Sequence, residues 1–235
     1  SAARALCARL GDHRGHFASH RLIWNHSLMR HPVPTTLGHA RELMSEARAS
    51  RSPAELALAH RALGCSLLYA GKHLEADRLL RRGIALADKL PDSDFADYGE
   101  HPGMVCRGFG AWARALRGAR NLATRLADAG IGHARRRDEP HGLAFALVTA
   151  GLVHLIQRDE PRAEAAAEEV LALAQECELP QWIAFGHEIR GWVACRRGEL
   201  ASGIELIAQA LAKLHATGAR THSSRILANL AEACL

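Results

Sequence analysis

The chain has 235 residues, of which 48% are hydrophobic, so it is long enough to bury one sizeable core or two small ones. Its formal net charge is +5, but arginines and acidic residues alternate along the sequence, which is not the basic stripe typical of nucleic-acid binding. Alanine and leucine dominate, aromatic residues make up 5%, and no segment alternates β-branched residues as a strand would. An all-α fold is therefore expected.

The sequence has no run of about 18 consecutive apolar residues and no charged segment followed by an apolar one near its start, so it predicts neither a membrane span nor secretion. Six cysteines are scattered without a C-x-x-C spacing, which is typical of reduced, packed thiols in a cytoplasmic protein. Because the first residue is a serine, we expect the sequence to be a piece of a longer protein.

The first segment, residues 1–53, predicts a divergent pair of helices. One helix runs from His16 to Met29, and residues 30–34, which contain two prolines, predict a turn. The helix expected after this turn has apolar residues at helical spacing: Ala40, Met44 and Ala47.

The next segment, residues 54–91, gives the clearest helical hairpin. Gly64 lies midway along an apolar helix, Gly71 marks a tight turn, and a second helix follows. A small residue in each helix lets the two helices approach closely, which a larger side chain would prevent. Small or apolar residues return along the second helix at helical spacing: Ala76, Leu80 and Gly83.

The same pattern returns in three later segments, residues 103–140, 141–180 and 181–220, and a repeat of this period predicts stacked helical hairpins. The residues equivalent to Gly64 follow at intervals of 47, 40 and 40 residues: Ala111, Gly151 and Gly191. The corresponding turn residues are Gly118, Arg158 and Gly198. The second helices keep the spacing of the first hairpin: Ala123, Ala127 and Gly130; Ala163, Ala167 and Val170; Gly203, Ile207 and Ala210.

Prolines separate the hairpins and are expected to stop helices, because proline lacks a backbone donor and restricts the residue before it: Pro53, Pro91, Pro140 and Pro180. Residues 91–103 form the longest predicted loop and the expected weak point of the array. Residues 221–235 predict the first helix of a further hairpin. These segments predict one domain, residues 1–235, folded as a right-handed superhelical solenoid of about five antiparallel helix pairs plus a terminal helix.

The small-residue pattern, with prolines between helix pairs, resembles the tetratricopeptide repeat. A narrower resemblance is to the C-terminal helical region of large bacterial proteins that join a class III adenylate or guanylate cyclase domain to an ATPase domain. The strings that carry it together are Tyr98-Gly99-Glu100-His101-Pro102-Gly103, Ala111-Trp112, Ala144-Phe145-Ala146-Leu147, Arg190-Gly191-Trp192, and Gly203-Ile204 with Ala216-Thr217-Gly218.

This second resemblance covers roughly residues 56–235 and implies a regulatory helical region of a bacterial signalling protein. The sequence departs from that family at His101, where an acidic residue is frequent. Neither the metal-binding carboxylates of a cyclase nor a phosphate-binding G-x-x-x-x-G-K-[ST] loop is present, so the resemblance implies no nucleotide chemistry in this sequence.

Histidine is the strongest candidate for chemistry. His13, His16 and His20 are spaced i, i+3 and i+7, which places them on one helical face where neutral imidazoles bind zinc or nickel. No H-E-x-x-H string and no suitably spaced cysteine joins them, so an exposed polar stripe is favoured over a metal site, and no cofactor is expected.

Catalytic groups are not evident. Acidic pairs such as Asp159-Glu160 consist of adjacent residues, which point to different sides of a helix. His222, Ser223 and Ser224 are adjacent, but together with the preceding threonine they are typical of a capped helix start rather than of a nucleophile. The chain is therefore predicted not to be an enzyme.

The expected functional surface is the concave side of the solenoid, which is lined by the first helix of each pair and binds extended peptides or helices in such folds. Tryptophan and arginine are favoured contact types, although packing between neighbouring hairpins is the alternative for each aromatic residue. The candidate groove residues are Tyr69, Trp112, Phe145, Phe185, Glu188, Trp192 and Arg196.

Two functions follow from this surface. The first is a non-catalytic interaction or regulatory module of a cytoplasmic bacterial signalling protein, with a protein, a peptide or a neighbouring domain as partner. The second is a small-molecule sensor domain of an ATPase-linked transcriptional regulator. No nucleic-acid or membrane partner is expected, and an apolar face left open after Leu235 makes a homodimer a further option.

Overall fold

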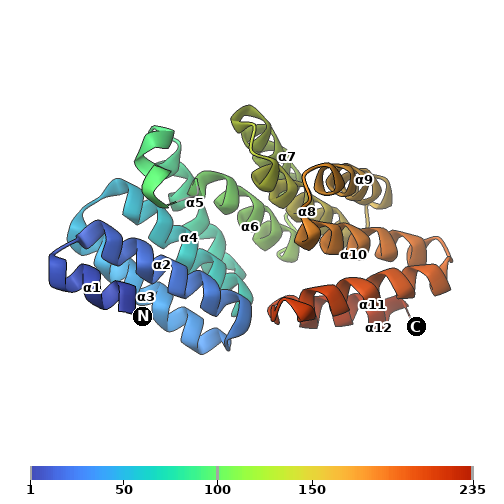
Figure 1. The fold of residues 1–235 in the computed structure, drawn as a ribbon. Coiled ribbons are helices and arrows are strands. Elements are labelled where there is room, and N and C mark those ends of the chain that lie inside the picture. The colour runs from blue at the N-terminus through green and yellow to red at the C-terminus, as the bar shows by residue number, and fades with distance from the viewer. Residues whose placement is uncertain (1, 99–100, 234–235) are drawn as a thin grey trace. The chain divides into compact units, whose positions relative to one another are not determined.

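The structure is a computed structural model that describes residues 2–98 and 101–233. All regular structure in these residues is helical and none of it is strand, which confirms the all-α prediction (Figure 1). The helices are α1 (Ala2–Leu10), α2 (His13–Arg30), α3 (Val33–Ser50), α4 (Pro53–Tyr69), α5 (His73–Ala87), the 3-10 helix η1 (Asp92–Tyr98), α6 (Pro102–Leu116), α7 (Arg120–Arg137), α8 (Pro140–Gln157), α9 (Glu160–Glu176), α10 (Pro180–Arg196), α11 (Leu200–Ala216) and α12 (Ser223–Ala233).

The chain divides into two compact units, Ser1–Ala113 and Arg114–Leu235, and the division falls inside α6. In the N-terminal unit each helix from α1 to α4 packs against the next one, and α2 also contacts α4 (Figure 1). Apolar side chains with less than 2% exposure fill the space between these helices: Trp24, Leu43, Leu58 and Leu80.

In the C-terminal unit each helix from α7 to α11 also packs against its successor. The even-numbered helices touch as well, because α10 contacts both α8 and α12. In this unit α10 therefore packs against its hairpin partner α11, against α9, and against the even-numbered helices on either side of it. The core of this unit includes Leu147, Val170, Ile189, Ile207 and Ile226.

Glycine residues lie at the positions where the sequence predicts close contacts between helices. A Cβ atom added to Gly64 in α4 would lie 2.7 Å from Leu80 Cγ in α5. A Cβ atom added to Gly191 in α10 would lie 2.8 Å from Ile207 Cγ1 in α11. Each contact joins a glycine to the residue 16 positions later, so both hairpins cross at the same point. The second-helix residues predicted in all four hairpins are buried.

The turns inside the hairpins are left-handed at the residue predicted for each. Gly71, Gly118 and Gly198 have φ angles of 75°, 76° and 88°, a region that suits a residue without a Cβ atom. The fourth turn uses Arg158, whose φ is 56° and which ends α8 in the same conformation. Each of these turns therefore requires a residue with a left-handed backbone, which is glycine in three hairpins and Arg158 in the fourth.

Three of the predicted prolines open helices rather than stop them. Pro53, Pro140 and Pro180 are the first residues of α4, α8 and α10. Proline suits this position because the first backbone N–H groups of a helix have no intrahelical acceptor and its φ is already helical. The prolines still separate the hairpins, but by starting the following one.

Residues 91–103, predicted as the longest loop, contain η1, which packs against the N-terminal unit. Phe95 and Tyr98 are buried, and the Tyr98 ring meets Phe17 of α2 edge-on at 6.0 Å. The Tyr98 hydroxyl donates to Glu55 of α4 over 3.2 Å, and burial beside this carboxylate raises the pKa of Tyr98 to about 12. Arg21 donates to the Tyr98 carbonyl, so the segment is held to two helices.

One described helix, α8, is long and apolar enough to cross a membrane by length and composition alone, but 72% of it is buried. It packs against α7, α9 and α10 in the C-terminal unit. The apolar side chains of α8 are therefore packed mainly against other helices of this unit. The terminal helix predicted over residues 221–235 begins at Ser223, and the end that suggested a homodimer lies outside the described residues.

Candidate functional site

The predicted groove residues of the N-terminal unit form an aromatic cluster. Tyr69 at the end of α4 meets Trp112 of α6 edge-on, with ring centroids 5.7 Å apart. Phe109 stacks on Trp112 at 6.1 Å and lies 6.2 Å from Tyr69. Trp112 is 6% exposed and Tyr69 is half-buried, so this cluster packs α4 against α6 and leaves only part of Tyr69 accessible.

In the C-terminal unit, Trp182 connects the predicted residues Phe145 and Phe185. Its ring lies 6.1 Å from Phe145 of α8 and 5.8 Å from Phe185 of α10. The Trp182 Nε1–H group donates to Nδ1 of His141 over 3.0 Å. Trp182 was not among the sequence candidates, although it lies three residues before Phe185 and so on the same helical face.

Glu188 and Trp192 of α10 are buried, with exposures of 0% and 2%. Glu188 accepts hydrogen bonds from Arg225 and from the side-chain amide of Asn229, both on α12. Of the seven groove candidates, Arg196 is exposed, and its Nε donates to Glu160 over 3.2 Å. A partner-binding role for this set stays a prediction, and the accessible members are Tyr69, Phe145 and Arg196.

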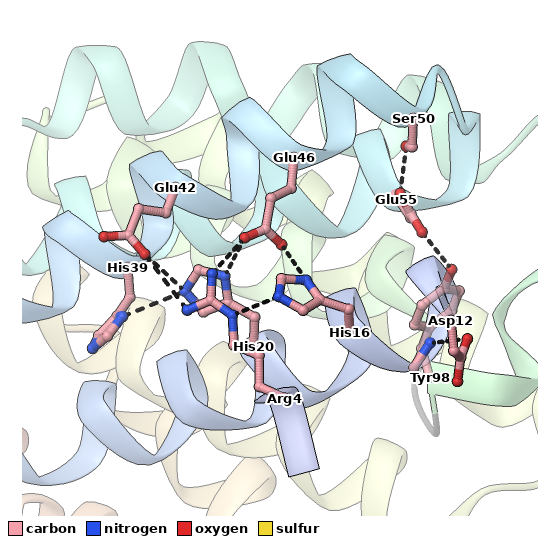
Figure 2. A network of polar contacts seen from close by, with 11 residues as sticks. Arg4, Asp12, His16, His20, His39, Glu42, Glu46, Ser50, Glu55 and Tyr98 are labelled. Atoms are coloured by element: carbon pink, nitrogen blue, oxygen red, sulfur yellow. Dashed lines mark hydrogen bonds and ion pairs between the residues drawn. The ribbon is translucent and has the colours of Figure 1, made fainter. Parts of the chain in front are cut away.

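A second cluster lies in the N-terminal unit, where polar side chains join α1, α2 and α3 (Figure 2). His20 of α2 is fully buried, and its Nδ1 lies 2.9 Å from Oε1 of Glu46 on α3. A carboxylate only accepts, and Glu46 is nearer to Nδ1 than Glu42 Oε2 is to Nε2, at 2.9 Å against 3.4 Å, so we assign the proton to Nδ1 and leave Nε2 its lone pair. Burial lowers the pKa of His20 despite the bond to Glu46, so the ring is neutral at pH 7.

Two further side chains of α3 converge on Nε2 of His20 (Figure 2). The His39 Nδ1 atom lies 3.4 Å away, and the Glu42 Oε2 atom also lies 3.4 Å away. His39 and Glu42 are three residues apart, which places them side by side on one face of α3. These three atoms all lie within 4.8 Å of one another. His39 is half-buried and Glu42 is exposed, so the cluster is open to solvent.

Arg4 of α1 and His16 of α2 complete the network. The Arg4 guanidinium donates to Glu46 over 2.8 Å and, through Nε, to Nε2 of His16 over 3.0 Å. His16 is therefore engaged by Arg4, and His13 is exposed at the start of α2. Of the three histidines that the sequence placed on one face, only His20 contacts both His39 and Glu42.

Sequence reasoning missed His39, Glu42 and Glu46 because they reach His20 across the α2–α3 hairpin. Spacing within one helix reveals side chains on a common face, but it says nothing about the helix opposite. The one available signal was the pair His39 and Glu42 at i and i+3 on the expected second helix, opposite a helix rich in histidine.

No protein-family model matches the chain, and no curated protein matches it significantly. The resemblance to tetratricopeptide repeats and to the helical region of cyclase–ATPase proteins therefore stays a prediction.

Proposed function

We propose that the chain is a non-catalytic helical-repeat module that presents a surface to a protein, a peptide or a neighbouring domain within a cytoplasmic bacterial signalling protein. The observation that carries this proposal is the hairpin packing of α8 to α12, in which α10 contacts its hairpin partner and both neighbouring first helices. Proteins built from such stacks use the exposed side of the first helices as an extended binding surface.

The finer architecture is part of the same proposal. A tetratricopeptide-like right-handed superhelix would repeat one helix crossing in every hairpin. The contacts of Gly64 with Leu80 and of Gly191 with Ile207, each 16 residues apart, support such a repeat. Left-handed turn residues at Gly71 and Gly198, each seven residues after the crossing glycine, support it as well.

The side chains proposed to touch a partner are the accessible ones among the groove candidates. Arg196 is exposed, and Tyr69 and Phe145 are half-buried. Arginine and tyrosine are enriched at the centres of protein interfaces, where they combine a large contact area with directed hydrogen bonds. The buried candidates Trp112 and Trp192 act indirectly in this proposal, because they hold the backbones of α6 and α10 in place.

Site-specific photocrosslinking tests this proposal. A photoreactive amino acid would replace Arg196, Phe145 or Tyr69 in the full chain, and crosslinked proteins from a lysate of the source cells would be identified by mass spectrometry. Arg190 gives a matched control, because it is also exposed on α10 but six residues earlier, on a different side of the helix.

The expected result is one protein crosslinked at the three candidate positions and not at Arg190. Arg196→Glu should weaken its capture, whereas Arg190→Glu should not, with both variants keeping the helical circular dichroism of the parent chain. Equal crosslinking at all four positions, or none at any of them, would contradict the proposed surface.

A further inference from the structure

We propose that His20, His39 and Glu42 form a binding site for a divalent transition-metal ion, with Zn²⁺ as the best match. The three donor atoms are His20 Nε2, His39 Nδ1 and Glu42 Oε2, and they come from the two helices of the α2–α3 hairpin (Figure 2). This site is independent of the proposed partner surface, which contains none of these residues.

The chemistry of the donor set selects the kind of ion. Imidazole nitrogen suits Zn²⁺, Cu²⁺ and Ni²⁺, whereas Mg²⁺ and Ca²⁺ prefer sites made of oxygen alone. Two histidines and one glutamate are also a ligand set that zinc uses when it keeps a fourth position for water. The exposed carboxylate of Glu42 gives an ion a route from solvent to the buried nitrogen of His20.

The distances fit a tetrahedral ion. Zinc bonds to nitrogen or oxygen are about 2.0–2.1 Å long, so two ligand atoms of a tetrahedral site lie about 3.3–3.4 Å apart. His20 Nε2 lies 3.4 Å from His39 Nδ1 and 3.4 Å from Glu42 Oε2. Two of the three ligand separations are therefore already those of a metal site, and the third lies within 4.8 Å.

The protonation state of His20 favours metal binding. With its proton on Nδ1, the Nε2 lone pair faces the Glu42 carboxylate, and neither atom carries a proton to share. A cation placed between the Nε2 atom of His20 and the Glu42 carboxylate accepts an electron pair from each of them. The half-buried ring of His39 binds through Nδ1 once its proton is on Nε2, a tautomer that it reaches by exchange with water.

Glu46 acts as a positioning residue for this site. Its carboxylate accepts the Nδ1–H bond of His20 at 2.9 Å, which fixes both the orientation of the ring and the tautomer. Histidines that bind zinc usually donate their second N–H group to such a partner. The arrangement of Glu46 and His20 therefore reproduces a recurring feature of zinc sites before any ion is considered.

The charge around the cluster also favours a cation. Glu42 and Glu46 bring two negative charges, and Arg4 brings one positive charge. Arg4 bonds to Glu46 over 2.8 Å and lies farther from Glu42, at 3.9 Å. Of these carboxylate and guanidinium charges, one negative charge is left in excess beside the donor atoms.

Isothermal titration calorimetry on the full chain, first freed of metal by dialysis against chelator, tests the site with ZnCl₂. We expect saturable binding of one Zn²⁺ ion. His39→Gln and Glu42→Gln each remove one ligand at an accessible position and should weaken binding by more than a hundredfold. Glu46→Gln should weaken it about 10–100-fold, as expected for a residue that orients a ligand.

Two histidine variants serve as matched controls. His13→Gln tests the face that the sequence suggested, and His26→Gln removes another exposed histidine of α2. Both should bind Zn²⁺ as the parent chain does. Co²⁺ gives a second readout, because a tetrahedral site produces intense visible absorption bands, which His39→Gln should abolish while its far-ultraviolet circular dichroism stays unchanged.

The absence of saturable heat with Zn²⁺ in the parent chain would overturn the proposal. Binding that survives both His39→Gln and Glu42→Gln would also overturn it, as would binding that is lost in His13→Gln. None of these outcomes bears on the photocrosslinking at Arg196, so the two proposals fail separately.

Discussion

The carboxylate of Glu188 in α10, which has no exposure to solvent, is bonded through both of its oxygens to the guanidinium of Arg225 in α12. Asn229, one turn further along α12, donates a third hydrogen bond to Glu188 over 3.0 Å. A buried carboxylate is costly unless it is paired with a cation and hydrogen-bonded, and Glu188 meets both conditions across a helix–helix contact. The side chain of Arg225 keeps 16% exposure, so the two partners are not equally buried.

Removing the arginine should therefore cost more than removing the glutamate. In Arg225→Met the Glu188 carboxylate stays buried and loses its counter-ion, and we expect the free energy of unfolding to fall by about 3–5 kcal/mol. Glu188→Leu should cost less, because the Arg225 side chain has some access to water. The double variant should recover most of the loss, since an apolar pair needs no desolvated charge.

Urea denaturation of the parent chain and the three variants measures this thermodynamic cycle. A loss below about 1 kcal/mol in Arg225→Met would contradict the prediction, because such a value is typical of an exposed ion pair.

The close approach of α4 and α5 at Gly64 gives a second prediction. A Cβ atom at this position would lie 2.7 Å from Leu80 Cγ, and Leu80 is fully buried, so the added methyl group must displace a core side chain. Gly64→Ala should lower the free energy of unfolding by about 1–3 kcal/mol, the usual cost of overpacking.

Gly38 in α3 is the matched control for this substitution. Apart from the chain neighbours and the backbone of its own helix, no atom of the described residues lies within 4 Å of a Cβ added there, and the residue is also inside a helix. Gly38→Ala should raise the free energy of unfolding by about 0.5–1 kcal/mol, because alanine loses less backbone entropy than glycine in a helix. Thermal unfolding distinguishes the two variants by sign, and the same sign in both would contradict the close contact at Gly64.

The contrast between Gly64 and Glu188 shows which features the sequence was able to predict. Helical periodicity, the crossing glycines and the left-handed turns are set by residues close together in the chain, so a repeated local pattern revealed them. Arg225 lies 37 residues from Glu188, and nothing near either residue indicates the other. The sequence therefore suggested Glu188 as a contact for a partner, whereas the structure bonds it to α12.

The cluster around His20 shows that the same limit, the unpredictability of contacts between helices, applies to the candidate metal site. The sequence spacing placed the histidines of α2 on one side of that helix. The set of metal ligands, however, depends on which turn of α3 lies opposite them. That register is decided by the packing of buried residues such as Trp24 and Leu43, which the spacing of polar residues does not encode. Most helices were thus predictable, although α1 and η1 were not expected, and the pairing of side chains between helices was not predictable.

His60 gives a prediction for the dependence of stability on pH. Burial in α4 and, to a smaller extent, the nearby positive charges of Arg82 on α5 and Arg48 on α3 lower its pKa to about 4. In the unfolded chain a histidine has a pKa near 6.5. Between these values the unfolded state binds more protons, so the stabilisation from neutral His60 is complete above about pH 6.5 and is lost as the pH falls towards 4.

The variant His60→Gln cannot be protonated in this range. Its free energy of unfolding should therefore decrease less than that of the parent chain between pH 7 and pH 4. NMR of the imidazole carbons should show one resonance that titrates only near pH 4 and is missing in His60→Gln. A His60 resonance with a midpoint near 6.5 would contradict the prediction.

The turn at Arg158 lets the cost of a left-handed backbone be measured within this chain. Arg158 has a φ of 56° where the equivalent hairpin turn has Gly198 at 88°. A left-handed conformation costs a residue with a Cβ atom about 1–2 kcal/mol. Glycine avoids this cost, but it loses more conformational entropy on folding, so the net gain from glycine is smaller. The guanidinium also bonds to Glu232 over 2.9 Å, but both side chains are largely exposed, so this pair contributes at most about 1 kcal/mol.

We expect Arg158→Gly to be more stable than Arg158→Ala by about 1 kcal/mol, since both variants lose the ion pair and differ only in the Cβ atom. Gly198→Ala should lose a similar amount relative to the parent chain. Chemical denaturation of the three variants tests this, and equal stabilities for Arg158→Gly and Arg158→Ala would show that the turn is not left-handed in solution.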